Sequence, residues 1–508
     1  MEIENQFDLE ARFQRIFMNY HDISALVRSI FRFSMAIVIL LLSGCAAVGP
    51  NYVPPGTSVS GNWHTQLQGG LKAEVAGAQS LAAWWTKFND PELSGLIERA
   101  AAGNLDLKKA RARVRQARAS RGVAWAGLFP VLDATGSATR SSTSNNAGIG
   151  TTSNLYAGGV DASWELDVFG GIRRSVEAAD ADLRAAQEDL RDVLVSLLAE
   201  TVLNYVEVRT YQDRLAVAET NLGSQDETYR LTLWRYQAGL SDELAVQQAR
   251  YNLENTRSQL PTLRTGIEGA MNRLAVLLGE TPGKVHAELE ERKPIPVTPP
   301  EVAVGVPADV LRQRPDVRRA ERELAAQTAR IGVATADLYP KFTLSGAIGL
   351  QSLSTGNLLS SGSGVVSGGP GVTWRIFDAG AIRKNIEIQS ALQEQYLIAY
   401  ETAVLAALEE VENAFSAYAE EQRRSQSLNE ATQAAGQAAE LAQLKYQAGL
   451  TDFTNVLDAQ RSLLNFQEAL TQSKGKVTAN LIKLYKALGG GWESLAPDEK
   501  KQRVNGEK

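Results

Sequence analysis

Residues that could do chemistry are scarce in this 508-residue sequence, which holds one cysteine and three histidines. Cys45 has no second thiol to pair with, so an intramolecular disulfide and a cysteine-rich metal site are both excluded. His21, His64 and His286 are too far apart to form a spaced ligand motif. The sequence contains no phosphate-binding loop, no nucleophile elbow and no H-E-x-x-H zinc motif. We therefore expect no catalytic site, no metal site and no cofactor.

Charge and composition exclude a further class of function. The net charge is −6 with 44% hydrophobic residues, and both signs of charge are interspersed along the chain. A nucleic-acid-binding protein would carry a basic field, whereas interspersed charges are typical of solvated helix faces. No nucleic-acid partner is expected.

The lone cysteine takes its chemistry from the segment before it. Residues 28–45 read RSIFRFSMAIVILLLSGC, with basic residues, an apolar run too short to span a bilayer, and then small residues. The ending LSGC resembles the lipobox of bacterial lipoproteins. This resemblance implies a signal peptide over 1–44, N-acyl and S-diacylglycerol lipid on Cys45, and delivery to the outer membrane, since Ala46 rather than Asp follows. Residues 1–27 are consistent with a misassigned start codon, and an incidental buried cysteine is the alternative.

The rest of the chain contains two copies of one unit, offset by 210 residues. RYQAGLSDELAVQQARYNLE at 235–254 matches KYQAGLTDFTNVLDAQRSLL at 445–464. The register holds without a gap from 104 to 279 and from 314 to 489. Because only two copies occur, the chain is a duplication rather than a solenoid. Three segments lie between or beside the copies: 45–103, a Pro-rich linker at 280–313, and a tail at 490–508.

Each copy begins with a helical stretch that ends before a proline, Leu105–Leu128 and Val317–Leu338. Two strands follow in each copy, because apolar and polar residues then alternate with a period of two. Strands of about 9–11 residues match a bilayer crossing, and Trp164 and Trp374 would lie in their apolar stripe. The expected strands are at about 131–141, 155–168, 341–351 and 365–377, with polar loops at 141–154 and 352–371.

A long helical hairpin completes each copy, over about 171–278 and about 380–488. Apolar and small residues recur there at alternating spacings of four and three, which is the pattern of a coiled-coil seam. A helix from 171 to 237 would be roughly 100 Å long at ~1.5 Å per residue. No globular core requires a helix of that length.

The repeated YQAGL motif marks the tip of each hairpin. Gly239 and Gly449 suit the left-handed position after a helix end. The two residues that begin each returning helix are expected to be an N-cap hydroxyl followed by a first-turn acid. These pairs are Ser241 with Asp242 and Thr451 with Asp452.

Four strands with one apolar face cannot close on themselves in a membrane. Transmembrane barrels made by single chains need at least eight strands, and open sheet edges are not tolerated in hydrocarbon. We therefore expect several copies to share one barrel, which the hairpins continue as a tube. The alternative is a small soluble sheet beside an ordinary helical bundle.

The sequence resembles the outer-membrane factor family of TolC-like efflux channels, and most closely its OprM-like and NodT-like lipoprotein branch. The resemblance implies an α+β fold, with long coiled-coil-like helices and four transmembrane strands per protomer. It implies a homotrimer with a 12-stranded β-barrel, a 12-helix α-barrel and an equatorial domain. The segments that carry it are VGPNYVPP (48–55), WWTKFNDPELSGLIERA (84–100), RQRPDVRRAERELAA (312–326) and YQAGLTDFTNVLDAQRSLL (446–464).

The resemblance also implies a function and partners. The protein would be the outer-membrane exit duct of a tripartite efflux pump, exporting drugs, metals or other small molecules. Its partners would be outer-membrane lipid, a periplasmic adaptor that docks at the hairpin tips, and an inner-membrane transporter of the RND type. That transporter supplies the energy, so the duct itself needs no nucleotide or redox motif.

The family's gate can be carried over to single positions. Acidic residues inside the second hairpin tip ring the closed periplasmic mouth of relatives, and Asp458 matches this position. Arg461 matches a residue of the gate-holding contacts, and Tyr251 is its equivalent in the first copy. A ring of three carboxylates would attract cations and raise at least one pKa. The alternative is an exposed i,i+3 pair worth about 0.2–0.5 kcal/mol. Asn455 stands where some relatives have a second Asp, and Thr454 stands where others have an apolar residue.

Two other lipoprotein classes stand as alternatives. A periplasmic adaptor has one helical hairpin between split Gly-rich lipoyl-like halves, whereas this sequence predicts two hairpins and two strand pairs. A structural or adhesin-like coiled coil would lack strands with a lipid-compatible face.

Overall fold

A computed structural model describes residues 47–56, 61–74, 81–144, 146, 150–299 and 301–495. The predicted signal peptide over 1–44 and the predicted lipidation site Cys45 lie outside these residues. The chain divides into two compact units. The first unit comprises Met1–Val53, Arg118–Asp182 and Leu324–Tyr396, and the second comprises Pro54–Ala117, Leu183–Glu323 and Leu397–Lys508.

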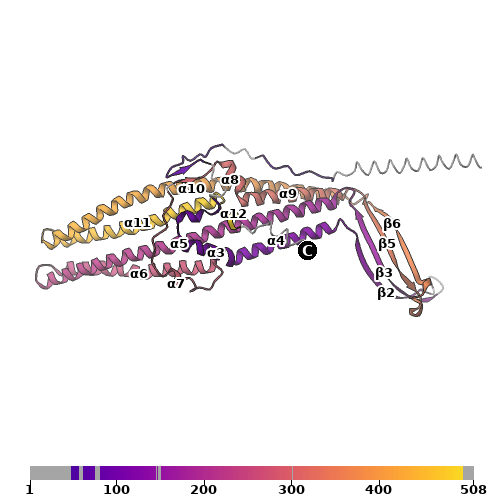
Figure 1. The fold of residues 1–508 in the computed structure, drawn as a ribbon, viewed down its shortest axis with the longest axis horizontal. Coiled ribbons are helices and arrows are strands. Elements are labelled where there is room, and N and C mark those ends of the chain that lie inside the picture. Colours follow the sequence, from indigo (N-terminus) through magenta and orange to yellow (C-terminus); the bar gives the residue numbers. More distant parts are fainter. Residues whose placement is uncertain are drawn as a thin grey trace, which may run out of the picture. The chain divides into compact units, whose positions relative to one another are not determined.

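The two copies build the same elements in the same order (Figure 1). The first copy forms α4 (Leu105–Ala126), β2 (Val131–Ser142), β3 (Thr152–Leu166), α5 (Gly171–Gln237) and α6 (Glu243–Leu277). The second copy forms α9 (Pro315–Ala336), β5 (Lys341–Ser352), β6 (Gly364–Thr373), α10 (Ala381–Gln447) and α11 (Phe453–Ala487). None of the described helices combines the length and hydrophobicity that a membrane crossing requires.

Short elements fill the segments outside the copies. They are β1 (Leu71–Lys72), η1 (Trp84–Phe88), α3 (Pro91–Gly103), α7 (His286–Leu289), β4 (Val302–Ala303), α8 (Pro307–Gln313) and α12 (Trp492–Leu495). β1 and β4 pair in parallel. Two further 3₁₀ turns, η2 (Thr355–Asn357) and η3 (Ser361–Ser363), lie between β5 and β6.

The four long strands form one antiparallel sheet in the order β2–β3–β5–β6. β3 and β5 join the two copies, with Val160 opposite Ile348. The backbones are close there, because a Cβ on Gly159 would lie 2.7 Å from the carbonyl oxygen of Ile348. β2 and β6 each pair on one side only among the described residues, so the sheet has two open edges.

The second strand of the second copy starts as predicted but ends early. β6 begins at Gly364, next to the expected start at about 365, and ends at Thr373 rather than at about 377. The loop expected at 352–371 is correspondingly shorter, because β6 occupies its last part. β6 contains Pro370, which an edge strand tolerates because no ladder hydrogen bond is lost on its outer side. Trp374, expected within the apolar stripe, therefore follows the strand, and its indole donates to the carbonyl of Leu338 at 3.0 Å. Trp164 does lie in β3 and makes the equivalent bond to a carbonyl of the first copy.

Four helices lie in a row, and the order α4–α5–α9–α10 holds in each unit separately. In the second unit, Asp189 of α5 pairs with Arg113 of α4 at 3.2 Å and with Arg319 of α9 at 2.9 Å. Val317 of α9 and Tyr400 of α10 share a hydrophobic cluster. In the first unit, the same neighbours are joined by other pairs: Arg121–Asp180, Arg330–Asp182 and Gln327–Gln389.

The largest hydrophobic core belongs to the second unit, where segments outside the copies pack on the long helices, and we call this region the collar. It combines aromatic residues of the segment before the first copy with apolar residues from α3, α5, α6 and α11. Trp84 is 1% exposed and stacks on Tyr485 with ring centroids 5.0 Å apart. Val302 and Val304, from the Pro-rich linker, complete this core. The segments outside the copies therefore serve to cover the helix rods.

Candidate gate and hairpin tips

Each hairpin tip is a tight turn that closes the end of a long helix. Gly239 has φ +72° and Gly449 has φ +75°, the left-handed conformation that glycine adopts without strain. The N–H of Leu240 donates to the carbonyl of Arg235 at 2.8 Å, and Gly239 N–H donates to Tyr236. These two bonds are the Schellman arrangement, which satisfies the last carbonyls of α5. The second tip repeats both bonds.

The residues that cap the returning helices lie one position later than predicted. Asp242 is the N-cap of α6, and its carboxylate accepts a hydrogen bond from the Ala245 N–H at 2.8 Å. Asp452 occupies the N-cap position of α11, without a side-chain cap bond. Ser241 and Thr451 therefore precede the caps. An aspartate suits this place because it reaches the free N–H groups and its charge complements the positive end of the helix.

The two tips pack against each other in the second unit. A small hydrophobic cluster joins α6 to the end of α10 and the start of α11. Arg235 of the first hairpin donates to the carbonyl of Tyr446 at 2.8 Å, and its guanidinium lies 4.6 Å from the Tyr446 ring centroid. A cation at this place also suits the negative end of α10. The buried residues of the cluster are Ala245, Ala249, Tyr446, Phe453, Val456 and Leu457.

Arg461 and Tyr251, the residues predicted to hold the gate, are in contact. The Arg461 guanidinium lies 4.9 Å from the Tyr251 ring centroid, a cation–π distance. Arg461 Nε donates to Asn252 Oδ1 at 3.2 Å. These two contacts tie α11 to α6 just inside the tips.

Asp458 lies one turn before Arg461 on α11 and is exposed. Within the described part of the chain it has neither an ion pair nor a hydrogen-bond partner for its carboxylate. The i,i+3 pair with Arg461 is therefore not formed, because the arginine turns to α6 instead. Gln248 is the equivalent of Asp458 in the first copy, so the acid occurs once per chain.

Sequence reasoning missed two residues of this region. Asn252 gives no signal, since its equivalent in the second copy is Ser462 and neither belongs to a motif. Arg235 could have been found, because it and its equivalent Lys445 are both basic and end a long helix.

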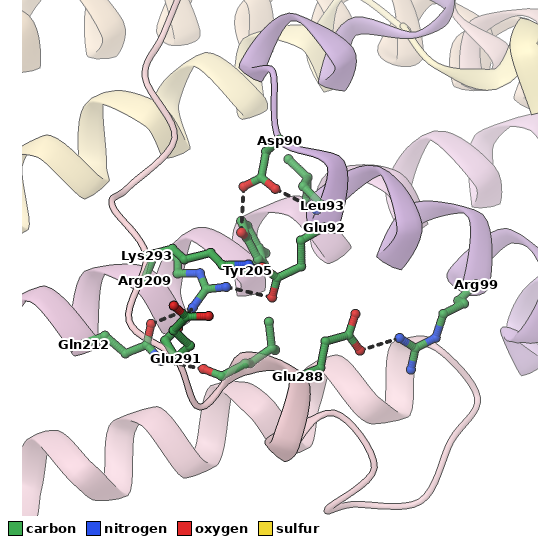
Figure 2. Close-up of polar contacts among 11 residues, drawn as sticks. Asp90, Glu92, Leu93, Arg99, Tyr205, Arg209, Gln212, Glu288, Glu291 and Lys293 are labelled. Atoms are coloured by element: carbon green, nitrogen blue, oxygen red, sulfur yellow. Dashed lines mark hydrogen bonds and ion pairs between the residues drawn. The ribbon is translucent and has the colours of Figure 1, made fainter.

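A separate cluster of charged and polar side chains lies in the collar (Figure 2). Arg209 of α5 is fully buried and pairs with Glu92 of α3 at 2.8 Å. It also donates to the carbonyl of Glu291 at 2.7 Å, in the segment after α7. Lys293 pairs with the same Glu92, and this hydrogen bond raises the pKa of the lysine.

A tyrosine extends this cluster to the start of α3. Tyr205 donates its hydroxyl to Asp90 at 2.6 Å, and Asp90 is also the N-cap of α3. Burial raises the pKa of the Tyr205 hydroxyl, so it stays a neutral donor at any physiological pH. Arg209 and Lys293 both face Glu92, and Asp90 accepts hydrogen bonds from the Tyr205 hydroxyl and the Leu93 N–H. This arrangement positions the chain segments of the collar relative to α5.

The long hairpins, the four-stranded sheet and the tip contacts together define a class of protein, and comparison with known families identifies it. The family model for the outer membrane efflux protein matches residues 96–280 and 306–490, once for each copy. The chain therefore belongs to the outer membrane efflux protein family. Members of this family are channels, and the protein is an outer-membrane efflux channel. The family, the mostly helical fold with its four strands, and the outer-membrane location that the sequence predicted are confirmed.

Individual relatives extend over nearly the whole chain. Nodulation protein T of Rhizobium leguminosarum bv. trifolii is 34% identical, over 92% of this chain and 98% of that protein. The pyoverdine export outer membrane protein OpmQ of Pseudomonas aeruginosa is 32% identical, over 91% and 97%. The solved structure of the outer-membrane channel OprN matches with a TM-score of 0.80 and 37% identity, over 88% of this chain and 100% of that one.

Proposed function

We propose that the protein is the exit duct of a tripartite efflux pump, conducting small molecules passively from the periplasm to the exterior through a gated mouth. The observation that carries this proposal is the open sheet of four strands attached to two long helical hairpins. In hydrocarbon, each unpaired edge group of β2 and β6 would cost several kcal/mol. A further copy of the sheet is the partner that pairs those edges.

Three copies would make a closed pore. Their sheets would form a 12-stranded barrel, and their hairpins would form a tube of 12 helices below a collar. A homotrimer is the state that the family resemblance implies, and its twelve strands satisfy the minimum of eight for a closed transmembrane barrel. The collar cores would then lie around the middle of the tube.

The gate would lie where α11 leaves its tip. Three exposed Asp458 carboxylates around the threefold axis would attract a cation between them and so hold the helix ends together. Arg461, with Tyr251 and Asn252, would hold α11 against α6 in the closed state. Opening would require α11 to move away from α6 or its neighbour.

The hairpin tips would be the docking place of a periplasmic adaptor, which in turn contacts an inner-membrane transporter of the RND type. Leu240 and Leu450 support this, because both project from the tips with 69% and 77% of their surface exposed. Exposed apolar side chains in equivalent places suit a partner that repeats around the pore. The residues proposed for docking are Gly239, Ser241, Asp242, Gly449, Thr451 and Asp452.

Conductance of the purified protein in planar bilayers tests the duct and its gate. We expect the wild-type pore to be mostly closed and Asp458→Ala to raise the time-averaged current several-fold, because the shared-charge link is lost. Arg461→Ala should act in the same direction by freeing α11 from Tyr251. Gln248→Ala, at the equivalent position of the first copy, is the matched control and should stay closed. An unchanged closed state in Asp458→Ala contradicts the gate, and monomers that never pass current contradict the duct.

The lipid anchor on Cys45 is a separate proposal, supported by the LSGC sequence. Mass spectrometry of the mature N-terminus should show a chain that begins at Cys45 and carries N-acyl and S-diacylglycerol groups. Cys45→Ser should lose this added mass, because serine offers no thiol for the diacylglycerol transfer. A wild-type N-terminus without lipid would overturn the proposal.

A further inference from the structure

The row of helices α4–α5–α9–α10 has two end helices with an uncovered face. Exposed residues recur along both helices at alternating spacings of three and four, which is the spacing of a helix-packing seam. On α4 the exposed positions include one series with this spacing: Leu105, Lys108, Ala112, Arg115, Ala119 and Gly122. On α10 they are Ile388, Ala391, Gln395, Ile398, Thr402 and Leu405. Two helix seams thus face no neighbour within the described chain.

The two end helices carry opposite charge. α4 has seven Lys and Arg residues and one acid, Asp106. Between residues 385 and 410, α10 has five Glu and no Lys or Arg. Part of this charge is unpaired within the described part of the chain: Lys108, Lys109, Arg115 and Arg118 on α4, and Glu394, Glu401 and Glu409 on α10. A basic edge and an acidic edge of one molecule suit each other.

The duplication shows how these edges would pack. In the repeat, α9 is the equivalent of α4 and α5 is the equivalent of α10. The helices α9 and α5 are in contact within the chain. The equivalent positions are covered there: Ala329, the equivalent of Ala119, is 0% exposed. A Cβ on Gly332 would lie 2.7 Å from the Arg174 side chain of α5, whereas a Cβ on its equivalent, Gly122, would meet nothing within 4 Å. The exposed seam of α4 therefore has the same two small residues at these positions as the seam of α9 that packs against α5, but no helix of the described chain packs against it.

The same equivalence gives the register of the missing contact. Within the chain, Arg318 of α9 pairs with Glu188 of α5 at 2.8 Å, and Arg319 pairs with Asp189 at 2.9 Å. The equivalent of Arg318 is Lys108, and the equivalent of Glu188 is position 398 of α10. Glu401 lies within one turn of position 398, on the exposed side. One heptad further along each antiparallel helix, Arg115 comes opposite Glu394.

We propose that α4 of one copy packs in antiparallel fashion on α10 of the next copy, with Lys108 paired to Glu401 and Arg115 paired to Glu394. Both pairs are seven residues apart on each helix, so they repeat on one face. Ala112 lets the helices approach closely between the ion pairs, and Ala119 and Gly122 do so beyond Arg115. The inference rests on the proposed self-assembly and adds the contacts by which copies recognise each other.

Charge reversal of the full-length protein in detergent tests the pairing. Lys108→Glu with Arg115→Glu should reduce the trimer fraction at a given concentration roughly tenfold or more, because like charges would face each other at every contact. Glu394→Lys with Glu401→Lys should do the same. All four substitutions together should restore the trimer, since the pairs return with exchanged sign. Lys474→Glu with Lys476→Glu on α11 is the control and should leave the trimer intact. Native mass spectrometry counts the copies, and failure of the fourfold variant to recover would overturn the pairing.

Mixing the two reversed proteins gives a further test. The variant with Lys108→Glu and Arg115→Glu has two acidic edges, and the variant with Glu394→Lys and Glu401→Lys has two basic edges. Favourable contacts therefore require the two variants to alternate around the ring. A ring of three cannot alternate, and one repulsive contact always remains. We expect no recovery on co-expression, and full recovery would overturn the three-membered ring.

A cysteine pair separates failure of this inference from failure of the proposed function. Lys108→Cys with Glu401→Cys should form covalent dimers and trimers under mild oxidation, whereas each single variant should form none. If the double variant gives no crosslink while the protein conducts as a trimer, the pairing is wrong and the duct stands. If the wild type is monomeric and passes no current, the proposed function itself has failed.

Discussion

Replacing Arg209 by methionine is expected to lower the free energy of unfolding by about 3–5 kcal/mol, the usual loss when one partner of a buried ion pair is removed. The arginine has no exposed surface, and Glu92 would lose one of its two cationic partners. The carbonyl of Glu291 would lose its hydrogen bond as well. Urea denaturation of the detergent-solubilised protein, followed by far-UV circular dichroism, measures the loss.

Arg99, in the same collar, is the matched control. It pairs with Glu280 at 2.8 Å and with Glu288 at 2.6 Å, so it makes two ion pairs where Arg209 makes one, to Glu92. Figure 2 shows the pair of Arg99 with Glu288. Its side chain is 37% exposed, however, and water replaces the lost partner. We expect Arg99→Met to cost about 1 kcal/mol or less. Equal losses in the two variants would contradict the role of burial. Adding Glu92→Gln to Arg209→Met should recover part of the stability, because the carboxylate that keeps only Lys293 as a cationic partner is then replaced by a neutral amide.

The collar shows what the sequence could not predict. Arg209 has no counterpart in the second copy, where Ala419 stands, so the repeat gives no sign of it. Its partner Glu92 and the carbonyl of Glu291 that it also binds come from segments outside both copies, which carry no periodicity. Contacts between segments so far apart depend on the packed fold rather than on any local pattern.

The rods and strands were predictable for the opposite reason. Each is long, periodic and present twice, and α5 begins at residue 171 and ends at residue 237 as the pattern indicated. The errors lie at ends, where local signals compete. Pro370 and several glycines favoured a loop, but an edge strand accepts them. At the tips, the sequence predicts the N-cap one residue too early, because a hydroxyl and a carboxylate cap a helix in the same way.

The gate was predictable only in part. Asp458, Arg461 and Tyr251 come from a family resemblance, and the structure brings the last two together. Their gating role stays a prediction until conductance is measured. The tie from Arg461 to Asn252 needed coordinates, because helix register across α6 and α11 decides which side chains face each other.

Replacing Gly279 by alanine should destabilise the protein far more than replacing the glycine of a hairpin tip. Gly279→Ala is expected to lower the free energy of unfolding by roughly 3 kcal/mol or more. Gly239→Ala should lower it by about 1–2 kcal/mol, because there the only cost is an alanine in the left-handed conformation. The two residues have nearly the same backbone, with φ +74° and φ +72°. A Cβ on Gly279 would lie 2.3 Å from the carbonyl oxygen of Gly103, whereas a Cβ on Gly239 would meet nothing within 4 Å. Urea denaturation again gives both values.

The second copy supplies an intermediate case that makes the comparison decisive. Gly489 is the equivalent of Gly279, with φ +72°, and a Cβ there would lie 3.3 Å from the backbone of Arg314. The expected order of destabilisation is Gly279 first, Gly489 second and Gly239 last. Since the backbone conformation is the same in all three, only the surroundings can produce that order. Equal losses at the three positions would mean that the close backbone crossing of α3 and α6 contributes little, and that the collar is held by its side chains alone.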